Sequence, residues 1–448
     1  STVDHMAEQE RLFGTDGIRQ QVGTYPFTIV ETYKIGYALG KWAVRKYGQH
    51  CTLLLGHDTR ESCAWLKATM KAGILSHPIR IYDAGVQPTP VIANLVTRQK
   101  ICAWGLIISA SHNPYHDNGL KIIDSIDGKL SLHDELAIEK IFYSDNVIPS
   151  YKHFGTDRPF FSTETKYINN IISMFAPDML SELTIVLDCA NGATSFLAPK
   201  IFTLLGAKVH TLNASPNGRN INFRCGSTDP KTLQNTVIEN NADIGIAFDG
   251  DGDRVVIVDM NGNVKNGDDI LSILMNNKRY KGASGLVGTI MSNMGLQNLV
   301  EKNNQTFYRT AVGDKYVIRK LKDENLQLGG EPSGHIIMGD YLFTGDGIYA
   351  ALKVLETIIQ TNNWACTTFV HTPNRLINVP IKNRKSLTDG PLADIIHQHE
   401  QNLPEGRILV RYSGTEPLLR VMVESDDGQV AHNAAEQLAT ILQTHLHS

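Results

Sequence analysis

The chain has 448 residues, of which 42% are hydrophobic and 20% charged, and its formal net charge is −4. This length predicts three or four domains, and the composition is typical of a globular protein with an ample core. Because basic and acidic residues are nearly balanced, the charge argues against sequence-independent nucleic-acid binding. The longest apolar run, 101–108, is too short to span a bilayer.

The first residues carry neither the basic segment nor the apolar stretch of a secretory signal. Residues 1–5, before Met6, are interpreted as a cloning remnant. The six cysteines are scattered without a Cys-x-x-Cys pair, which argues against a disulfide framework or a zinc site. Together these features favour a cytoplasmic protein with no membrane partner.

Short β-rich runs alternate with helical patterns over most of the chain, as in an α/β protein. Residues 30–47 carry apolar side chains at helical spacing and predict an early helix. Buried strands are predicted at 53–56, 106–108, 184–187, 244–248 and 285–288. Several of these runs end in clusters of Gly, Asp or Ser, where an α/β sheet places its binding loops.

The order of elements predicts three comparable α/β domains and a smaller α+β domain, without a literal sequence repeat. The expected ranges are 6–155, 156–260, 261–372 and 373–448. In the last of them, strands predicted at 407–412 and 418–423 flank a tight loop, and a closing helix follows. The predicted apolar stripe of that helix consists of Ala434, Leu438, Ile441, Leu442 and Leu446.

The strongest local signal is Asp249-Gly-Asp-Gly-Asp-Arg254, between two predicted strands. Its three carboxylates can converge on one hard cation, while the glycines let the backbone turn tightly. Without a metal, three such charges would repel one another strongly. The spacing does not fit an EF-hand, so the loop predicts an Mg²⁺ site, with a solvated acidic turn as the alternative.

The second signal is Ser109-Ala-Ser-His-Asn-Pro-Tyr-His-Asp-Asn-Gly-Leu-Lys121, which follows a predicted buried strand. A hydroxyl at a strand end, such as that of Ser111, is placed to act as a nucleophile or phosphate carrier. From chemistry alone, an ordinary polar turn with Asn113-Pro114 as its breaker stays open as the alternative.

Three further loops carry polar clusters. Gly329-Gly-Glu-Pro-Ser-Gly-His335 combines a carboxylate, a hydroxyl and an imidazole, which suits hydroxyl recognition. Arg411-Tyr-Ser-Gly-Thr-Glu-Pro-Leu-Leu-Arg420 places two arginines and two hydroxyls around a turn, a suitable cradle for a phosphate dianion. Gly14-Thr-Asp-Gly-Ile-Arg19 is a weaker Gly-rich turn. A glycine turn with a surface His and a charged hairpin loop are the respective alternatives for the first two.

Three standard motifs are absent from the sequence: the P-loop, the Gly-x-Gly-x-x-Gly fingerprint and the Gly-x-Ser-x-Gly elbow. ATP-driven transfer, Rossmann redox chemistry and α/β-hydrolase chemistry therefore have no support from sequence motifs.

In this order, the five loops resemble those of the α-D-phosphohexomutase superfamily, and most closely those of its bacterial phosphoglucosamine mutases. The likeness runs from about Arg11 to Glu424, nearly the whole chain. The stretches that favour the glucosamine branch, besides the first loop, are Thr344-Gly-Asp-Gly-Ile348, Val312-Gly-Asp-Lys-Tyr-Val317 and Arg420-Val-Met-Val-Glu424. The resemblance implies four domains around a central cleft, three related α/β units and a smaller fourth.

The resemblance implies that Ser111 carries the transferred phosphoryl group as phosphoserine. One Mg²⁺ would then be held by an oxygen of that group together with Asp249, Asp251 and Asp253. Arg19 and Arg254 would neutralise the transferring group. The acid/base candidates of the family match Lys121 and His335, with a Lys121 pKa that the site lowers.

Substrate contacts follow from the resemblance in the same way. Glu331 and Ser333 match the family's sugar-hydroxyl contacts. The residues that match the loop gripping the non-reacting phosphate are Arg411, Ser413, Gly414, Thr415 and Arg420. Two positions depart from the family pattern: Gln20 stands where a glycine is usual, and Pro332 stiffens the sugar loop and removes an N–H donor.

The implied reaction interconverts glucosamine 6-phosphate and glucosamine 1-phosphate through a hexose 1,6-bisphosphate, for amino-sugar and cell-envelope precursor synthesis. A phosphoglucomutase or phosphomannomutase is the nearest alternative, because one sugar substituent changes affinity by only a few kcal/mol. A haloacid-dehalogenase-like phosphatase fits poorly, since Asp253 stands where that pattern needs Thr or Val. A non-catalytic sugar-phosphate-binding relative is a third alternative, and a homodimer is expected by analogy.

Overall fold

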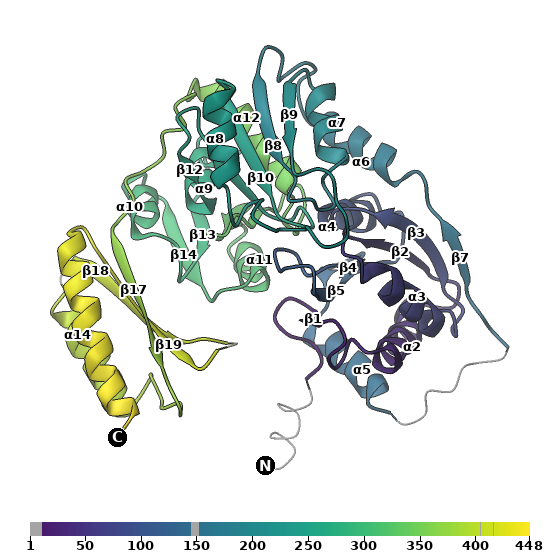
Figure 1. Ribbon diagram of the computed structural model, residues 1–448, viewed down its shortest axis with the longest axis horizontal. Helices are drawn as coiled ribbons and strands as arrows, with labels where there is room; N and C mark the ends of the chain where they lie inside the picture. Colours follow the sequence, from purple (N-terminus) through teal and green to yellow (C-terminus); the bar gives the residue numbers. More distant parts are fainter. Residues whose placement is uncertain (1–10, 145–151, 404, 415) are drawn as a thin grey trace. The chain divides into compact units, whose positions relative to one another are not determined.

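The computed structural model describes residues 11–144, 152–403, 405–414 and 416–448 (Figure 1). The expected cloning remnant lies outside these residues, and so does Thr415. The chain divides into two compact units. The first takes in the chain up to Thr289 together with Thr310–Thr368, and the second consists of Ile290–Arg309 and Phe369–Ser448.

The first sheet of the first unit has the strand order β1-β5-β4-β2-β3-β7, and β6 pairs with β5. Its strands are β1 (Ile18–Gln21), β2 (Thr52–His57), β3 (Arg80–Val86), β4 (Trp104–Ile108), β5 (Asp117–Asp124), β6 (Gly128–Lys129) and β7 (Thr156–Pro159). The helices are α2 (Ile29–Tyr47), α3 (Cys63–Ile74), α4 (Thr89–Ala93), α5 (Leu132–Phe142) and the π-helix η1 (Asn94–Arg98). Since β7 pairs with β3, this sheet reaches beyond residue 155, where the sequence analysis ends the first domain.

Helix α2 shows how the local sequence sets an element. It begins at an N-cap, Thr28, whose hydroxyl accepts a hydrogen bond from the Glu31 N–H, and it ends at Gly48 with φ 100°. Between them, Ile35, Leu39 and Trp42 lie on one face and are buried in the same core cluster as the first-sheet strands.

The second sheet has the order β12-β11-β10-β8-β9. Its elements are β8 (Thr184–Asp188), β9 (Lys208–Leu212), β10 (Ile244–Phe248), β11 (Val255–Val258) and β12 (Val264–Lys265), with helices α6 (Thr163–Ile172), α7 (Leu197–Leu204) and α8 (Lys231–Glu239). Strands β8 and β10 are parallel, whereas β10 and β11 are antiparallel neighbours joined by the Asp-rich loop. Every residue of β10 is buried, as expected of an apolar central strand.

The third group of elements completes the first unit. It contains β13 (Gly285–Thr289), β15 (Leu328–Gly330), β16 (Ile336–Met338), α9 (Gly267–Leu274), α11 (Asp314–Asp323) and α12 (Gly347–Thr361). Strand β15 runs parallel to β13 and antiparallel to β16, so the loop between β15 and β16 is the tip of a hairpin. That tip is 331–335, the predicted sugar loop.

The second unit contains an antiparallel sheet of order β17-β19-β18. Its elements are α10 (Met294–Lys302), β14 (Thr306–Thr310), whose last residue belongs to the first unit, β17 (Asn374–Pro380), α13 (Gly390–Gln401), β18 (Gly406–Tyr412), β19 (Leu418–Ser425) and α14 (Gly428–Leu446). Helix α14 contributes Leu438, Leu442 and Leu446 to a core shared with Leu419 and Val421 of β19. The expectation for one residue of that helix was wrong, because Ile441 is exposed.

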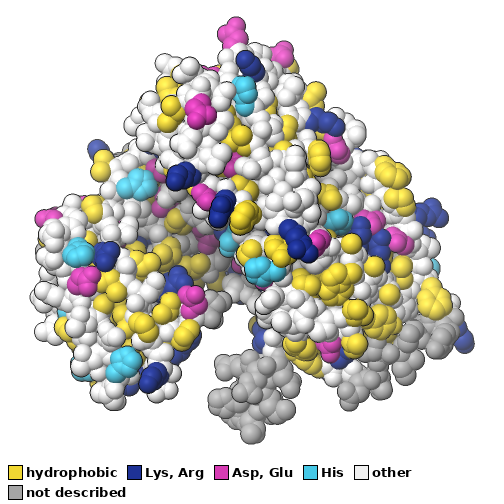
Figure 2. All heavy atoms as spheres, in the orientation of Figure 1, with side chains coloured by type: hydrophobic (Ala, Val, Ile, Leu, Met, Phe, Trp, Pro, Cys, Tyr) yellow, Lys and Arg dark blue, Asp and Glu magenta, His cyan; other side chains and the backbone are white. Residues whose placement is uncertain are grey.

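The seven strands and the two helices whose ranges the sequence predicts are all present. All six cysteines are buried as free thiols. On the face in Figure 2, basic and acidic side chains are interspersed, without a single-sign patch. Across the described ranges, no helix combines the length and apolarity needed to cross a membrane.

Candidate active site

The Asp-rich loop brings its three carboxylates together. One oxygen from each of Asp249, Asp251 and Asp253 lies within 4.8 Å of the others, and all three side chains are buried. The turn requires Gly252, whose φ is +74° and whose added Cβ would lie 2.6 Å from the Thr194 methyl group. The loop therefore forms a compact oxygen cluster of the kind that binds a hard cation.

The three carboxylates of this cluster repel one another, and their pKa values shift in different directions. Burial and the charges of Asp253 and Asp251 raise the pKa of Asp249 well above its ordinary value. Burial and the charge of Asp253 also raise the pKa of Asp251, and its Oδ1 atom is buried without a hydrogen-bond partner. Burial by itself would raise the pKa of Asp253, but Lys121, His335 and Arg254 lower it well below its ordinary value. The unpaired oxygen and the mutual repulsion fit a site that binds a divalent cation.

The Ser111 hydroxyl lies against this cluster. Ser111 Oγ donates to Asp249 Oδ2 at 2.5 Å and lies 3.2 Å from Asp253 Oδ1, and the residue is fully buried. Its backbone has φ +53°, which non-glycine residues seldom adopt. Gly250 allows the two loops to meet, because a Cβ there would lie 2.5 Å from the Ser111 carbonyl oxygen. The structure thus brings the predicted nucleophile and the predicted metal ligands together.

Three hydrogen bonds constrain the Ser111 backbone. Its N–H donates to Ser109 Oγ at 3.0 Å, and its carbonyl accepts from Arg60 Nη2 at 3.0 Å and from Asn222 Nδ2 at 2.8 Å. Arg60 is fully buried and ion-paired with Asp58 at 2.8 Å. These contacts stabilise the unusual backbone conformation.

Arg60 also holds the rest of this loop. Its Nη1 atom donates to three further carbonyls, those of Asn113, Pro114 and Asp117, at 2.9, 2.5 and 3.1 Å. Asn222 likewise donates a second time, to the Asn113 carbonyl at 3.0 Å. The sequence analysis missed both residues, because neither belongs to a motif with a chemical signature.

Thr89 at the start of α4 is another residue that the sequence analysis missed. Its hydroxyl donates to Asp251 Oδ2 at 2.5 Å, and its N–H donates to the Asp251 carbonyl at 2.9 Å. These bonds fix one oxygen of the Asp251 carboxylate and leave the other free for a ligand.

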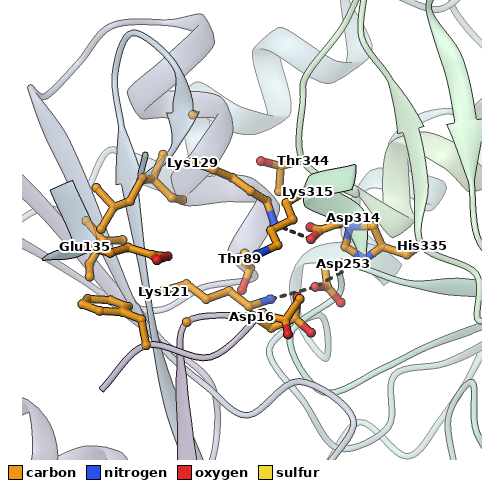
Figure 3. A pocket seen from close by; sticks show the side chains of 17 residues that line it. Asp16, Thr89, Lys121, Lys129, Glu135, Asp253, Asp314, Lys315, His335 and Thr344 are labelled. Atoms are coloured by element: carbon orange, nitrogen blue, oxygen red, sulfur yellow. Dashed lines mark hydrogen bonds and ion pairs between the residues drawn. The ribbon is translucent and has the colours of Figure 1, made fainter. Parts of the chain in front are cut away.

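Lys121, on β5, points into the same site (Figure 3). Its Nζ atom lies 3.1 Å from Asp253 Oδ2 and 3.8 Å from Asp251 Oδ2. Burial by itself would lower the Lys121 pKa, but the charges of Asp253 and Asp251 outweigh it and raise the pKa. The expectation of a lowered pKa was therefore wrong, and Lys121 rests as a cation.

His335 lies between two carboxylates. Its Nε2 atom is 3.2 Å from Asp314 Oδ2, and its Nδ1 atom is 3.7 Å from Asp253 Oδ2. Burial opposes the charged imidazole, but Asp314, Asp253 and Glu331 outweigh it, so the His335 pKa is raised. His335 and Lys121 both reach the pocket beside Asp253 (Figure 3).

The two predicted sugar contacts of the loop, Glu331 and Ser333, differ in burial. Glu331 is buried and its Oε1 atom accepts from the Gly313 N–H at 2.8 Å, whereas Ser333 is exposed. Pro332 has no N–H to donate, but its carbonyl accepts a hydrogen bond from the Gly267 N–H at 3.0 Å. The proline thus leaves the loop tied to the start of α9.

Several basic groups near Ser111 have buried atoms without hydrogen-bond partners. They are Nε of Arg19, Nε of Arg254 and Nδ1 of His112. Burial and the charges of Arg254 and Arg19 lower the His112 pKa to about 3. The unpaired N–H donors of the two arginines fit a phosphoryl group on the neighbouring hydroxyl. Gln20 does not crowd Arg19, because its side chain is exposed and β1 stays in register with β5.

The predicted phosphate loop lies in the second unit. Arg411 and Arg420 face each other in the register of β18 and β19 and line one small pocket. Burial and the charge of Arg420 lower the Arg411 pKa, and Arg420 Nε is buried without a partner. Arg420 has one long ion pair, with the exposed carboxylate of Glu416 at 3.9 Å. Two guanidinium groups side by side fit a dianion.

The tip of this loop contains Ser413, which is buried, and Gly414, which is exposed. The Ser413 N–H donates to the Leu418 carbonyl at 2.9 Å, which closes the hairpin. Arg384, which the sequence analysis did not single out, donates to the Ser413 carbonyl at 2.7 Å.

Four family models match consecutive parts of the chain, all described as phosphoglucomutase/phosphomannomutase. They are α/β/α domain I over residues 10–147, domain II over 165–262, domain III over 266–372 and the C-terminal domain over 376–441. Among curated relatives, a phosphoglucosamine mutase of Acinetobacter baumannii is 43% identical, covering 96% of this chain and 98% of its own. One of Vibrio vulnificus is 39% identical and covers 97% and 98%.

Two solved structures share the fold at low identity. A phosphoglucomutase/phosphomannomutase family protein of Burkholderia thailandensis has a TM-score of 0.78 at 20% identity, covering 96% of this chain and 98% of its own. An N-acetylphosphoglucosamine mutase of Aspergillus fumigatus, in complex with GlcNAc-6P and magnesium, has a TM-score of 0.64 at 17% identity and covers 97% and 96%. With its four matching domains and relatives about 40% identical over nearly its whole length, the chain belongs to the phosphoglucomutase/phosphomannomutase family of phosphohexomutases.

Proposed function

We propose that this protein is a phosphoglucosamine mutase, which interconverts glucosamine 6-phosphate and glucosamine 1-phosphate. The observation that carries the chemistry is the buried Ser111 hydroxyl, 2.5 Å from Asp249 in a cluster of three carboxylates. The choice of amino sugar follows the curated relatives, which are phosphoglucosamine mutases.

In the proposed reaction, phosphorylated Ser111 transfers its phosphoryl group to the free oxygen of the sugar phosphate. The bond between Ser111 Oγ and phosphorus breaks and a bond between phosphorus and the sugar oxygen forms. The sugar hydroxyl loses its proton and Ser111 Oγ gains one, so a serine hydroxyl and a hexose 1,6-bisphosphate result. The second transfer returns the other phosphoryl group of the bisphosphate to Ser111. Because such transition states are loose, alignment and charge neutralisation supply most of the catalysis.

Arg19 and Arg254 have the unpaired buried donors that would bind the transferring phosphoryl oxygens. One Mg²⁺ would be held by Asp249, Asp251 and Asp253. Its positive charge would offset the negative charge of the phosphoryl oxygens. Lys121 and His335 would handle the proton of the reacting sugar oxygen. Since both rest protonated, they suit donation to the sugar oxygen that leaves when Ser111 is rephosphorylated.

The two-step scheme needs a second phosphate site, because one phosphate stays in place while the other reacts. Glu331 and Ser333 would contact the sugar hydroxyls, and the loop with Arg411, Ser413, Gly414, Thr415 and Arg420 would bind the non-reacting phosphate. The repulsion between Arg411 and Arg420 supports this role, since a bound dianion would relieve it.

Replacing Arg411 with Ala is expected to raise KM by about 10–100-fold, because a charge-assisted phosphate contact is lost, while kcat changes much less. Steady-state kinetics with glucosamine 1-phosphate would measure both constants. The matched control is Arg375→Ala, which removes an exposed arginine paired with Glu436 in the same unit. An unchanged KM in Arg411→Ala would remove the loop from the substrate site.

The substrate assignment is tested by comparing kcat/KM for glucosamine 1-phosphate, glucose 1-phosphate and mannose 1-phosphate, with Mg²⁺ and glucose 1,6-bisphosphate. We expect the amino sugar to be preferred by at least about tenfold, or ~1.4 kcal/mol in transition-state binding. A preference for glucose or mannose phosphate would instead identify a phosphoglucomutase or phosphomannomutase.

The remaining expectations are part of the same proposal. The first of the four domains would extend through β7, the others would end near residues 260, 372 and 448, and two copies would form a homodimer. A charged sugar phosphate does not cross a bilayer unaided, so an enzyme that uses one made inside the cell would work in the cytoplasm.

A further inference from the structure

The carboxylate of Asp314 borders the pocket that contains Lys121 and His335, yet phosphoryl transfer as proposed gives it no contact with the substrate (Figure 3). Asp314 is the first residue of α11 and lies in Val312-Gly-Asp-Lys-Tyr-Val317, one of the stretches that favour the glucosamine branch. Its side chain is only 8% exposed. A buried charge at the edge of a substrate pocket is a candidate for substrate recognition.

Two contacts connect Asp314 to the groups expected to handle the sugar. The N–H of the preceding Gly313 donates to Glu331 Oε1 at 2.8 Å, and Glu331 is the expected sugar-hydroxyl contact. On the other side, Asp314 Oδ2 lies 3.2 Å from His335 Nε2, next to the proposed acid/base groups. The carboxylate therefore lies beside His335, one residue from the N–H that binds Glu331, and so next to the groups expected to contact the sugar and its reacting oxygen. In a hexosamine 1-phosphate, the carbon that carries the amine adjoins the one that carries that oxygen.

The structure also shows that this carboxylate accepts an ammonium group. Asp314 Oδ1 is ion-paired with the Lys129 ammonium, which reaches it from β6 on the other side of the pocket (Figure 3). The Lys129 side chain is 35% exposed and long, so it can move aside without breaking a packed core. The charges of Lys129 and His335 outweigh burial and hold the Asp314 pKa well below its ordinary value, so the group stays ionised.

We propose that Asp314 is a specificity-determining residue that binds the C2 ammonium of the amino sugar, and that Lys129 covers its carboxylate in the free enzyme. A buried carboxylate binds an ammonium group more tightly than a hydroxyl, because the ammonium adds the Coulomb attraction of a second, opposite charge to the hydrogen bond. Glucose phosphate, with a hydroxyl at C2, would gain less from the same contact. This inference rests on the proposed function and names the residue that would select its substrate.

The test measures kcat/KM for glucosamine 1-phosphate and glucose 1-phosphate in the wild type and in Asp314→Asn, with Mg²⁺ and glucose 1,6-bisphosphate. The quantity that decides is the ratio of the two constants, because a loss of folded or active enzyme cancels in it. We expect this ratio to fall at least tenfold in Asp314→Asn, which is ~1.4 kcal/mol of lost discrimination. The matched control is Asp323→Asn, at the exposed end of the same helix, where the ratio should not change.

Lys129→Met provides the second arm. Without the competing ammonium, the KM for glucosamine 1-phosphate is expected to fall or stay level, and the ratio to be kept or to rise. An unchanged ratio in Asp314→Asn would overturn the inference. If both constants fell equally, the residue would act only by positioning His335. A wild type without preference for the amino sugar would contradict the proposed function itself, before any variant is compared.

Discussion

Replacing Ser111 with Ala is expected to lower kcat by a factor of roughly 10⁴ or more, as when other enzymes lose their nucleophile. The reason is geometric as well as chemical. The Ser111 hydroxyl lies 2.5 Å from Asp249 Oδ2, and hydrogen bonds with three residues, Ser109, Arg60 and Asn222, constrain the backbone that places it there. No other hydroxyl contacts Asp249 or Asp253 among the hydrogen bonds of the described residues, so none can replace it.

Two measurements together check this result. Steady-state rates with glucosamine 1-phosphate report turnover, and intact mass after incubation with glucose 1,6-bisphosphate reports phosphate on the protein. The wild type should carry the phosphate and Ser111→Ala should not. Ser173→Ala, which removes an exposed hydroxyl at the end of α6, should behave as the wild type in both. Wild-type rates in Ser111→Ala would refute the phosphoserine assignment.

Replacing Asp249 with Asn is expected to change activity and metal-free stability in opposite directions. Activity should fall by roughly 10³-fold, because a metal ligand contributes several kcal/mol of charge stabilisation. The thermal midpoint of the metal-free protein should rise by about 2–4 °C. A carboxyl whose pKa folding raises costs stability at neutral pH, and the neutral amide removes that cost while still accepting from Ser111.

Asp253→Asn provides the contrast within the same loop. Folding lowers the pKa of Asp253, so its charge stabilises the native state at neutral pH, through Lys121, His335 and Arg254. Removing that charge should therefore lower the metal-free midpoint. Thermal unfolding in EDTA and then with increasing MgCl₂ measures both variants against the wild type, whose midpoint should rise with Mg²⁺. An Asp249→Asn protein that keeps its activity and its Mg²⁺-dependent rise would exclude the cluster as the metal site.

The sequence was sufficient for the elements with a strong local pattern. The apolar runs at 53–56 and 244–248 became buried strands, because they are too short for a buried helix and are bounded by Gly and Asp residues that end a strand. Strand β7 escaped prediction because its four residues are all exposed and include a proline, so pairing with β3 alone makes it a strand. Ile441 is the converse case, since an apolar residue at the edge of a predicted stripe remained exposed.

The site divides in the same way between local and long-range information. Ser111 and the three aspartates lie in loops whose composition is enough to predict a nucleophile and a metal site. Arg60 and Asn222 act through contacts 51 and 111 residues away in the chain, and no local pattern marks them. The raised pKa of Lys121 has the same origin, because the carboxylates responsible come from another sheet.

The two hydrogen bonds from Asn222 affect whether parts of this architecture can be exchanged between related enzymes. Asn222 lies among the elements of the second sheet, whereas the carbonyls it binds, those of Ser111 and Asn113, follow a strand of the first sheet. The residue that carries the phosphoryl group thus takes its shape from two modules at once. Exchanging the first module between related enzymes would carry over the nucleophile but not its full support. Recombination within this family should therefore succeed best when both modules are inherited from one parent.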